Sequence, residues 1–200
     1  MSSATLVSVQ EYLATSFRPD RDYVDGEIQE RNLGERPHSR TQGRIYAFLF
    51  QREGRWGICV LPEQRVEVAP TRFRVPDICV LLASDPVEPI VRHPPFLCVE
   101  ILSPEDRVSR LNERLSDYFQ MGVRYVWVLD PQTRRAFCYM PGEMREVRDG
   151  MLRTTTPISR SRSRKFSSPN ISPRWLQPLP RELASIVRAK RPAIRLRWRA

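Results

Sequence analysis

Short apolar runs alternate with amphipathic stretches along the first 156 residues of the chain. Short runs bounded by Pro, Ser or Gly predict buried strands, whereas apolar residues three and four positions apart predict helices. We predict helices at residues 8–16, 37–53 and 108–121 and a hairpin at residues 21–31. Further strands are predicted at residues 57–62, 63–69, 78–82, 96–102, 124–130, 134–140 and 144–148. This order of elements predicts an α/β domain with a mixed sheet flanked by helices, in which the apolar strand 124–130 is central.

The charge of the chain is concentrated in its last part. Residues 157–200 hold 12 Lys and Arg against one acid, which leaves 21 basic and 22 acidic residues, a net charge of −1, in residues 1–156. We therefore divide the chain into a domain at 1–156 and an Arg/Ser/Pro-rich tail at 157–200, which is expected to be poorly structured. The tail is either a basic arm for nucleic acid or a segment translated out of frame, because its codons can be chosen so that the frame two bases on encodes the amphipathic sequence DLAIALSEIF.

Two carboxylates lie in apolar runs that should be buried. Asp77 follows Pro76 at the start of the strand predicted at 78–82, and Glu100 lies in the middle of the strand predicted at 96–102. A buried carboxylate is costly unless it is paired, protonated or bound to a metal. Two such residues on successive strands indicate that positive charge lies between them.

The strand pattern brings the two carboxylates to one cleft. Alternation places Glu100 on one face of its strand with Phe96, Cys98 and Leu102. Asp77 is expected at the mouth of its strand, because the proline before it cannot donate to the ladder. If the strands are neighbours, both carboxylates bind one ion, and two hard oxygen ligands with water suit Mg²⁺ or Mn²⁺. Such an ion acidifies a water and neutralises charge on a phosphate.

At these residues the sequence resembles the PD-(D/E)XK nuclease superfamily, because Pro76-Asp77 is followed by Glu100, 23 positions after the aspartate. The segments VEILSPEDR, YFQMGV and YVWVLDP, which begin at residues 99, 118 and 125, are similar to a bacterial family described as putative restriction endonucleases. The DGEI near residue 25 and His38 extend the resemblance, which covers about residues 8–155. It implies a restriction-endonuclease-like fold that hydrolyses DNA with Mg²⁺ held by Asp77 and Glu100.

The sequence departs from the superfamily pattern at the lysine two residues after the glutamate, where it has Leu102. In the resembled family this lysine is usually displaced onto the next helix, at the position of Arg114, and no lysine occurs before Lys165. Arginine stays protonated, so it cannot act as a base, but it can hold a phosphate oxygen bidentately. Arg114 is therefore either a phosphate clamp or the partner of a nearby acid such as Glu113, Asp117 or an active-site carboxylate.

Two further residues are candidates for the catalytic set. Glu27 follows the Asp25-Gly26 turn and is either a third acid near the metal or a solvated hairpin carboxylate. His38 opens the helix at 37–53 and either contacts phosphate or orients a water, or it is a local cap or surface residue.

We expect a cytoplasmic, Mg²⁺-dependent DNA endonuclease; the alternative is a nuclease fold that has lost catalysis and serves as a binding or regulatory module. A third interpretation places nucleic-acid binding in the basic tail. No membrane partner is expected, since no apolar run approaches the ~20 residues of a membrane span, and a homodimer is left open. The four cysteines lie singly among apolar residues, which favours buried free thiols.

Overall fold

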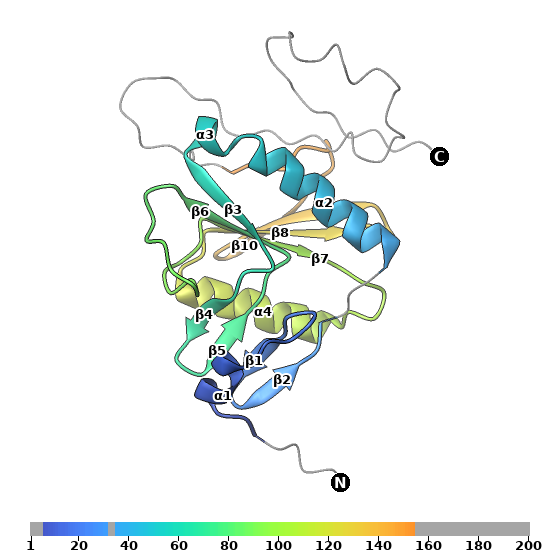
Figure 1. The fold of residues 1–200 in the computed structure, drawn as a ribbon. Coiled ribbons are helices and arrows are strands. Elements are labelled where there is room, and N and C mark those ends of the chain that lie inside the picture. The colour runs from blue at the N-terminus through green and yellow to red at the C-terminus, as the bar shows by residue number, and fades with distance from the viewer. Residues whose placement is uncertain (1–5, 32–34, 155–200) are drawn as a thin grey trace.

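The computed structural model describes residues 6–31 and 35–154, which form helices and two β-sheets (Figure 1). The helices are α1 (Val9–Ala14), α2 (Arg36–Phe50), α3 (Glu53–Trp56) and α4 (Val108–Met121). The strands are β1 (Asp22–Val24), β2 (Glu27–Gln29), β3 (Ile58–Pro62), β4 (Val66–Ala69), β5 (Arg72–Arg74), β6 (Ile78–Leu82), β7 (Leu97–Ile101), β8 (Tyr125–Asp130), β9 (Arg135–Met140) and β10 (Glu143–Glu146). Both expectations for the tail at 157–200 lie outside the described residues.

The larger sheet is mixed, with the strand order β10-β9-β8-β7-β6-β3. β7 and β8 run parallel, and the other neighbouring pairs are antiparallel. A parallel pair needs a long crossover connection, and α4 supplies it. The first five residues of β8 are buried, as the nearly continuous apolar run from residue 124 predicts. The predicted α/β class and mixed sheet are confirmed.

Helices cover both faces of the larger sheet, α2 on one and α4 on the other (Figure 1). Ile45 of α2 packs in one apolar cluster with Val99 of β7, whereas Leu111 of α4 packs in a second cluster with Cys98. Successive residues of β7 therefore face different helices. This alternation sends the side chain of Glu100 towards α4.

The smaller sheet has the strand order β2-β1-β5-β4 and joins the predicted hairpin to the strands before residue 75. At the hairpin turn, Asp25 has φ 49° and Gly26 has φ 98°. Both values are positive, as a type I′ turn requires, so the Asp-Gly pair fixes this turn. α1 packs against the sheet through buried Tyr12, which stacks on Tyr23 with ring centroids 4.9 Å apart.

One buried arginine connects the smaller sheet to α4. The side chain of Arg74 is 1 % exposed, donates from Nε to Asp117 of α4 at 2.7 Å and from Nη1 to Asp22 of β1 at 3.1 Å. A charge at this depth is tolerated only when it is paired on several sides. Local sequence patterns do not connect these acids with Arg74, because Asp117 lies 43 and Asp22 lies 52 positions away.

The structure corrects two details of the predicted elements. The helix predicted to end at Glu53 ends at Phe50, and a separate short helix, α3, ends at Trp56 and is capped by Gly57, whose φ of 64° is left-handed. Phe96 packs in the cluster that faces α2, on the opposite side from Cys98. It precedes β7, so strand alternation does not apply to it. The four cysteines are free thiols, as predicted.

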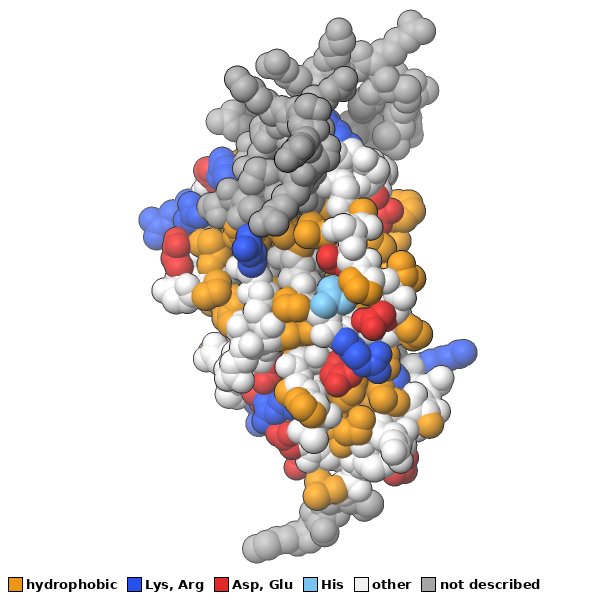
Figure 2. Space-filling model, turned by 90° about the vertical axis from the view of Figure 1, so that its left-hand side faces the viewer, with side chains coloured by type: hydrophobic (Ala, Val, Ile, Leu, Met, Phe, Trp, Pro, Cys, Tyr) orange, Lys and Arg blue, Asp and Glu red, His pale blue; other side chains and the backbone are white. Residues whose placement is uncertain are grey.

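Among the described residues visible in Figure 2, side chains of both charges are interspersed over this flank. This agrees with the net charge of −1 for residues 1–156. Among the described residues, none of the helices has both the length and the apolar character needed to cross a bilayer.

Replacing Arg74 by Ala is expected to lower the free energy of unfolding by about 3–5 kcal/mol, because Asp22 would remain buried without its cation and Asp117 would keep only its contact with Arg72 at 3.1 Å. Arg135→Ala is the matched control: Arg135 pairs with Glu146 at 2.7 Å, but its side chain is 55 % exposed. Urea unfolding followed by circular dichroism measures both variants. Equal, small losses would show that the Arg74 pairs contribute no net stability.

Candidate active site

Asp77 lies where the β6–β7 ladder ends. The last backbone pair recorded is Ile78 with Val99, and Asp77 Oδ2 accepts the N–H of Ile101 at 2.7 Å. The side chain thus supplies the acceptor at the point where Pro76 interrupts regular strand geometry. As predicted, Asp77 is at the mouth of its strand, and it is buried, with 2 % of its surface exposed.

Two basic side chains meet the other oxygen of Asp77. Arg31 Nη2 lies 2.5 Å from Asp77 Oδ1, and His38 Nε2 lies 3.4 Å from the same atom. Burial raises the pKa of Asp77, but the hydrogen bond from His38 and the charge of Arg31 outweigh it, so the net shift is downward. Asp77 is therefore a carboxylate held in its ionised form.

The pKa of His38 moves in the complementary direction. Burial lowers it, but the hydrogen bond and charge of Asp77 raise it more, which favours the imidazolium form. His38 lies in the first turn of α2, which holds it beside Asp77.

Glu100 lies in the middle of β7 and faces α4. Its Oε1 accepts the hydroxyl of Tyr118 at 2.6 Å, and its Oε2 lies 3.4 Å from Nη1 of Arg114. Burial raises the pKa of Glu100 to about 7, and the charge of Asp77 adds to this, while Arg114 and Tyr118 compensate only in part. At neutral pH Glu100 is thus poised between its neutral and ionised forms.

The strand register places the two carboxylates side by side. β6 and β7 pair Ile78 with Val99 and Cys79 with Cys98, and one further step along this register sets Asp77 opposite Glu100. Asp77 lies one residue before β6, so this register brings the backbones of the two acids close together, with Asp77 in contact with His38 of α2 and Glu100 facing α4. The charge of Asp77 contributes to the raised pKa of Glu100.

α4 positions both partners of Glu100, because Arg114 and Tyr118 are four residues apart and share one helix face. The helix ends at Gly122, whose φ of 104° suits a left-handed cap. Before the helix, Asp106 Oδ2 accepts the N–H of Ser103 at 2.7 Å, and Oδ1 lies 3.5 Å from Arg114 Nη2. Arg114 is held between the two acids, with its side chain 12 % exposed.

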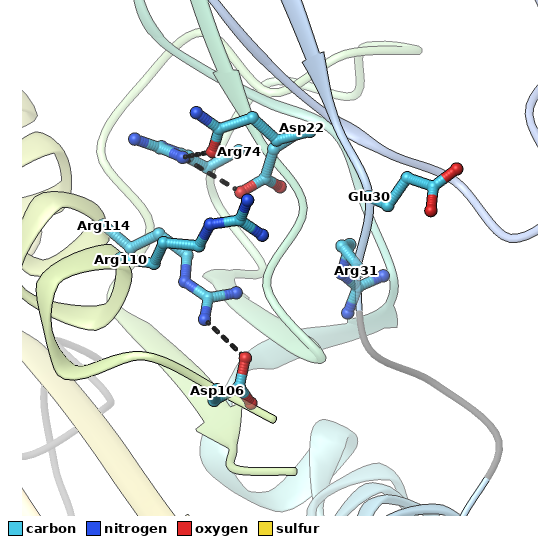
Figure 3. A pocket seen from close by; sticks show the side chains of 8 residues that line it. Asp22, Glu30, Arg31, Arg74, Asp106, Arg110 and Arg114 are labelled. Carbon is cyan, nitrogen blue, oxygen red and sulfur yellow. Dashed lines mark hydrogen bonds and ion pairs between the residues drawn. The ribbon is translucent and has the colours of Figure 1, made fainter. Parts of the chain in front are cut away.

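A small pocket opens beside these residues, between α4 and the segment that follows β2 (Figure 3). Arg110 and Arg114 extend into it from α4, and Arg31 approaches from the opposite side. Its volume is about 10 Å³, room for about one water molecule. The lining residues are Asp22, Gln29, Glu30, Arg31, Arg74, Asp106, Arg110 and Arg114.

The structure brings four of the five predicted catalytic residues into one buried cluster: Asp77, Glu100, Arg114 and His38. Glu27 lies apart from it. It is exposed in β2, four positions before Arg31, which corresponds to about 13 Å of extended chain. Its part in catalysis stays a prediction. Arg114 pairs with Glu100, which agrees with the ion-pair alternative expected for it, and its role as a phosphate clamp stays a prediction.

Sequence reasoning missed Arg31 and the hydrogen bond of Tyr118. Arg31 reaches Asp77 over 46 positions, and a single arginine after a hairpin carries no signal for such a contact. Tyr118 opens the segment YFQMGV and is fully buried. Tyr118 lies 18 residues after Glu100, in the next helix, and this position was the one sequence feature that could have indicated their hydrogen bond.

The donor set fits Mg²⁺ in kind, since both acids offer hard oxygen atoms. The raised pKa of Glu100 shows that the surrounding cations do not fully compensate its charge, so a further cation would be favoured there. Among residues 6–31 and 35–154, no group of three or more His, Cys, Asp or Glu is arranged to hold a metal. An ion at Asp77 and Glu100 would therefore keep several water ligands, as Mg²⁺ commonly does.

Comparison with known proteins agrees with this geometry. The model of the Uma2 family, described as a putative restriction endonuclease, matches residues 9–162. The chain belongs to this family. The Uma2 match extends over nearly the whole described region, and the restriction-endonuclease-like resemblance of the sequence is confirmed.

Among solved structures, this Uma2 chain is similar to a putative nuclease belonging to DUF820 from Anabaena variabilis ATCC 29413. The TM-score is 0.66 at 20 % sequence identity, and the match covers 76 % of this chain and 89 % of the other. At this identity the likeness shows a common fold. No curated protein matches the chain significantly.

Replacing Glu100 by Gln is expected to remove a pH-dependent loss of stability. The folded-state pKa of about 7 lies above the ordinary value of 4.5, so the folded protein binds this proton more tightly than the unfolded chain. The free energy of unfolding therefore falls as pH rises through this window. At about 1.4 kcal/mol per pKa unit, the wild type should lose about 2–3 kcal/mol more than Glu100→Gln between pH 5 and pH 7.5.

Urea unfolding of both proteins at pH 5 and pH 7.5 measures this difference. Because the pKa of His38 is raised, its contribution to the free energy of unfolding also falls at higher pH, but it falls in both proteins. The pKa of Asp77 is lowered, so its contribution changes only below this pH range. Both contributions therefore largely cancel when the two proteins are compared. Parallel pH profiles would show that Glu100 is already ionised at pH 5.

Proposed function

We propose that the domain is a Mg²⁺-dependent endonuclease that hydrolyses phosphodiester bonds of DNA. One observation carries the proposal: two buried carboxylates, Asp77 directly before β6 and Glu100 in the neighbouring strand β7, are each next to a largely buried guanidinium. Membership of the Uma2 family, described as a putative restriction endonuclease, supports nuclease chemistry at this site.

In this proposal Asp77 and Glu100 hold the ion. When bound, Mg²⁺ would lower the pKa of a water and neutralise charge that develops on the phosphate. His38 and the Ile101 N–H fix the orientation of Asp77, and the Tyr118 hydroxyl does the same for Glu100. These contacts hold both carboxylates in fixed orientations, so metal binding would need no rearrangement of the strands.

Arg114 is proposed to stabilise negative charge on the phosphate, the electrostatic task that the displaced lysine has in related sequences. Its pKa is raised, because the charge of Glu100 outweighs the effect of burial, so it stays protonated at any working pH. It can bind an oxyanion but cannot take up a proton. A proton from the attacking water must therefore leave by another group or to solvent.

A second function is favoured by a specific observation. Each carboxylate oxygen of Asp77 and Glu100 already faces a donor within the described chain, namely Arg31, His38, the Ile101 N–H, Tyr118 or Arg114. Paired in this way, the acids need no metal, and the fold would act as a binding or regulatory module. In the catalytic function a divalent ion would displace Arg31 from Asp77, whereas in the binding or regulatory module Arg31 would remain paired with Asp77.

Asp77→Asn and Glu100→Gln are each expected to lower Mg²⁺-dependent nicking of supercoiled plasmid by at least about 100-fold, since each removes a charged metal ligand. Glu143→Gln, on the exposed edge strand β10, is the control and should cleave like the wild type. Unchanged cleavage by both site variants would reject the assignment. Glu27→Gln in the same assay tests the remaining predicted acid.

Metal binding separates the active site from a degenerate one. Calorimetric titration of the wild type with Mg²⁺ at pH 6 should show binding with release of close to one proton, because Glu100 is largely protonated there and must ionise to hold the metal. Titrations in two buffers of different ionisation enthalpy measure the proton release. No binding of Mg²⁺ or Mn²⁺ would favour the binding module.

A further inference from the structure

We propose that the pocket in Figure 3 binds one phosphate group of a nucleic-acid backbone through Arg31, Arg110 and Arg114. The inference rests on the proposed function and extends it, because this phosphate is a neighbour of the one that would be cleaved. The phosphate in the pocket would be bound by those guanidinium nitrogens of Arg31 and Arg114 that do not contact Asp77 or Glu100.

Two buried donors at the pocket have no partner. Arg31 Nη1 and Arg114 Nε make no hydrogen bond with the described residues, although the two side chains are only 4 % and 12 % exposed. An unsatisfied buried donor costs about 1–3 kcal/mol, more when it is charged. An oxygen atom between these two residues would accept from both.

Arg110 adds a positive charge that the described chain does not neutralise. It is exposed, and its side chain makes no ion pair or hydrogen bond with another described residue. It lies four positions before Arg114 on the same face of α4, and like charges at this spacing repel. Both guanidinium groups point into the pocket, where an anion would relieve that repulsion (Figure 3).

The acids of the pocket do not cancel this surplus, because each is already paired. Asp22 accepts from Arg74 and from the Val75 N–H, and Glu30 pairs with Arg21 at 3.0 Å. Asp106 is engaged by the Ser103 N–H and by Arg114. The donors left over therefore belong to the arginines.

The size of the pocket selects a single oxygen atom. A volume of about 10 Å³ holds one water molecule, or one phosphate oxygen. A phosphate group would thus sit at the mouth of the pocket, with one oxygen inserted between Arg31 and Arg114 and with Arg110 closing over the others. Arginine binds both carboxylate and phosphate bidentately, but a carboxylate offers two oxygen atoms whereas a phosphate group offers more, so a phosphate can contact all three arginines at once.

The test is DNA binding by the full chain without metal. Wild type, Arg110→Gln and Arg124→Gln are titrated against a fluorescent DNA duplex in EDTA at several NaCl concentrations, and anisotropy is recorded. Arg124 is the matched control, an exposed arginine just beyond the far end of α4. The basic residues after 156 are common to all three proteins, so differences between the proteins report the substituted arginine alone.

Arg110→Gln is expected to weaken binding about tenfold at low salt, the loss of about one charge-assisted contact. The slope of log K against log[NaCl] should fall in magnitude by about one. Arg124→Gln should change neither quantity. Equal effects of the two substitutions, or no effect of Arg110→Gln, would overturn the proposal.

Competition identifies the ligand chemistry. Inorganic phosphate should displace DNA from the wild type more strongly than NaCl of equal ionic strength, and this excess should vanish in Arg110→Gln. If polyglutamate competes as well as phosphate, the pocket attracts any anion through its positive charge without selecting phosphate, and the proposal fails. These binding measurements need no metal, so they are independent of cleavage. If Arg110→Gln binds DNA like the wild type while Asp77→Asn loses nicking but still binds, the phosphate site fails and the proposed catalysis stands. If Arg110→Gln weakens binding while Asp77→Asn still nicks DNA, the proposed catalysis fails and the phosphate site stands.

Discussion

The compensation of two buried carboxylates is the constraint on which this structure depends. Asp77 and Glu100 are each 2 % exposed at neighbouring strand positions, where their charges repel. Ionised groups at this depth are tolerated only with close partners. Those partners come from four separate places in the chain: the segment after β2, the first turn of α2, the backbone of β7 and the middle of α4. The packing of these elements around the sheet thus serves the electrostatics of the pair as well as the apolar core.

The two carboxylates are compensated unequally, and this gives them different chemistry. Asp77 has an arginine at 2.5 Å, a histidine and a backbone N–H, which together lower its pKa despite burial. Glu100 has one arginine at 3.4 Å and a neutral hydroxyl, and burial raises its pKa to about 7. Environments that push two pKa values apart assign different roles to like groups. An added cation would alter the protonation of Glu100 far more than that of Asp77, which is already ionised.

Local sequence patterns predicted the helices and strands and the two acids of the site, but they did not predict which residues pair with those acids. Apolar runs predicted β6, β7 and β8, helical spacing predicted α4, and the Asp25-Gly26 pair predicted its turn. Asp77 and Glu100 stood out because a carboxylate conflicts with an apolar run. Arg31 conflicts with nothing in its own segment, and only the pairing of the sheets brings it to Asp77. The same holds for Arg74, whose two acids lie on different elements. Periodicity reports which face of an element is buried, and it does not report which distant charge will meet that face.

The chemistry of arginine gives a physical reason why the site can operate without lysine. An ammonium group is a compact point charge, whereas a guanidinium is a planar fork with five donors. Arg31 uses Nη2 for Asp77 and leaves Nη1 towards the pocket, and Arg114 uses Nη1 for Glu100 and leaves Nε. Each side chain can therefore contact a carboxylate on one edge and an oxyanion on the other. A lysine at either position could neutralise the carboxylate, but its single nitrogen could not present a second edge to the pocket. The absence of lysine from residues 1–156 thus matches a site in which the same cations face both the acids and the pocket.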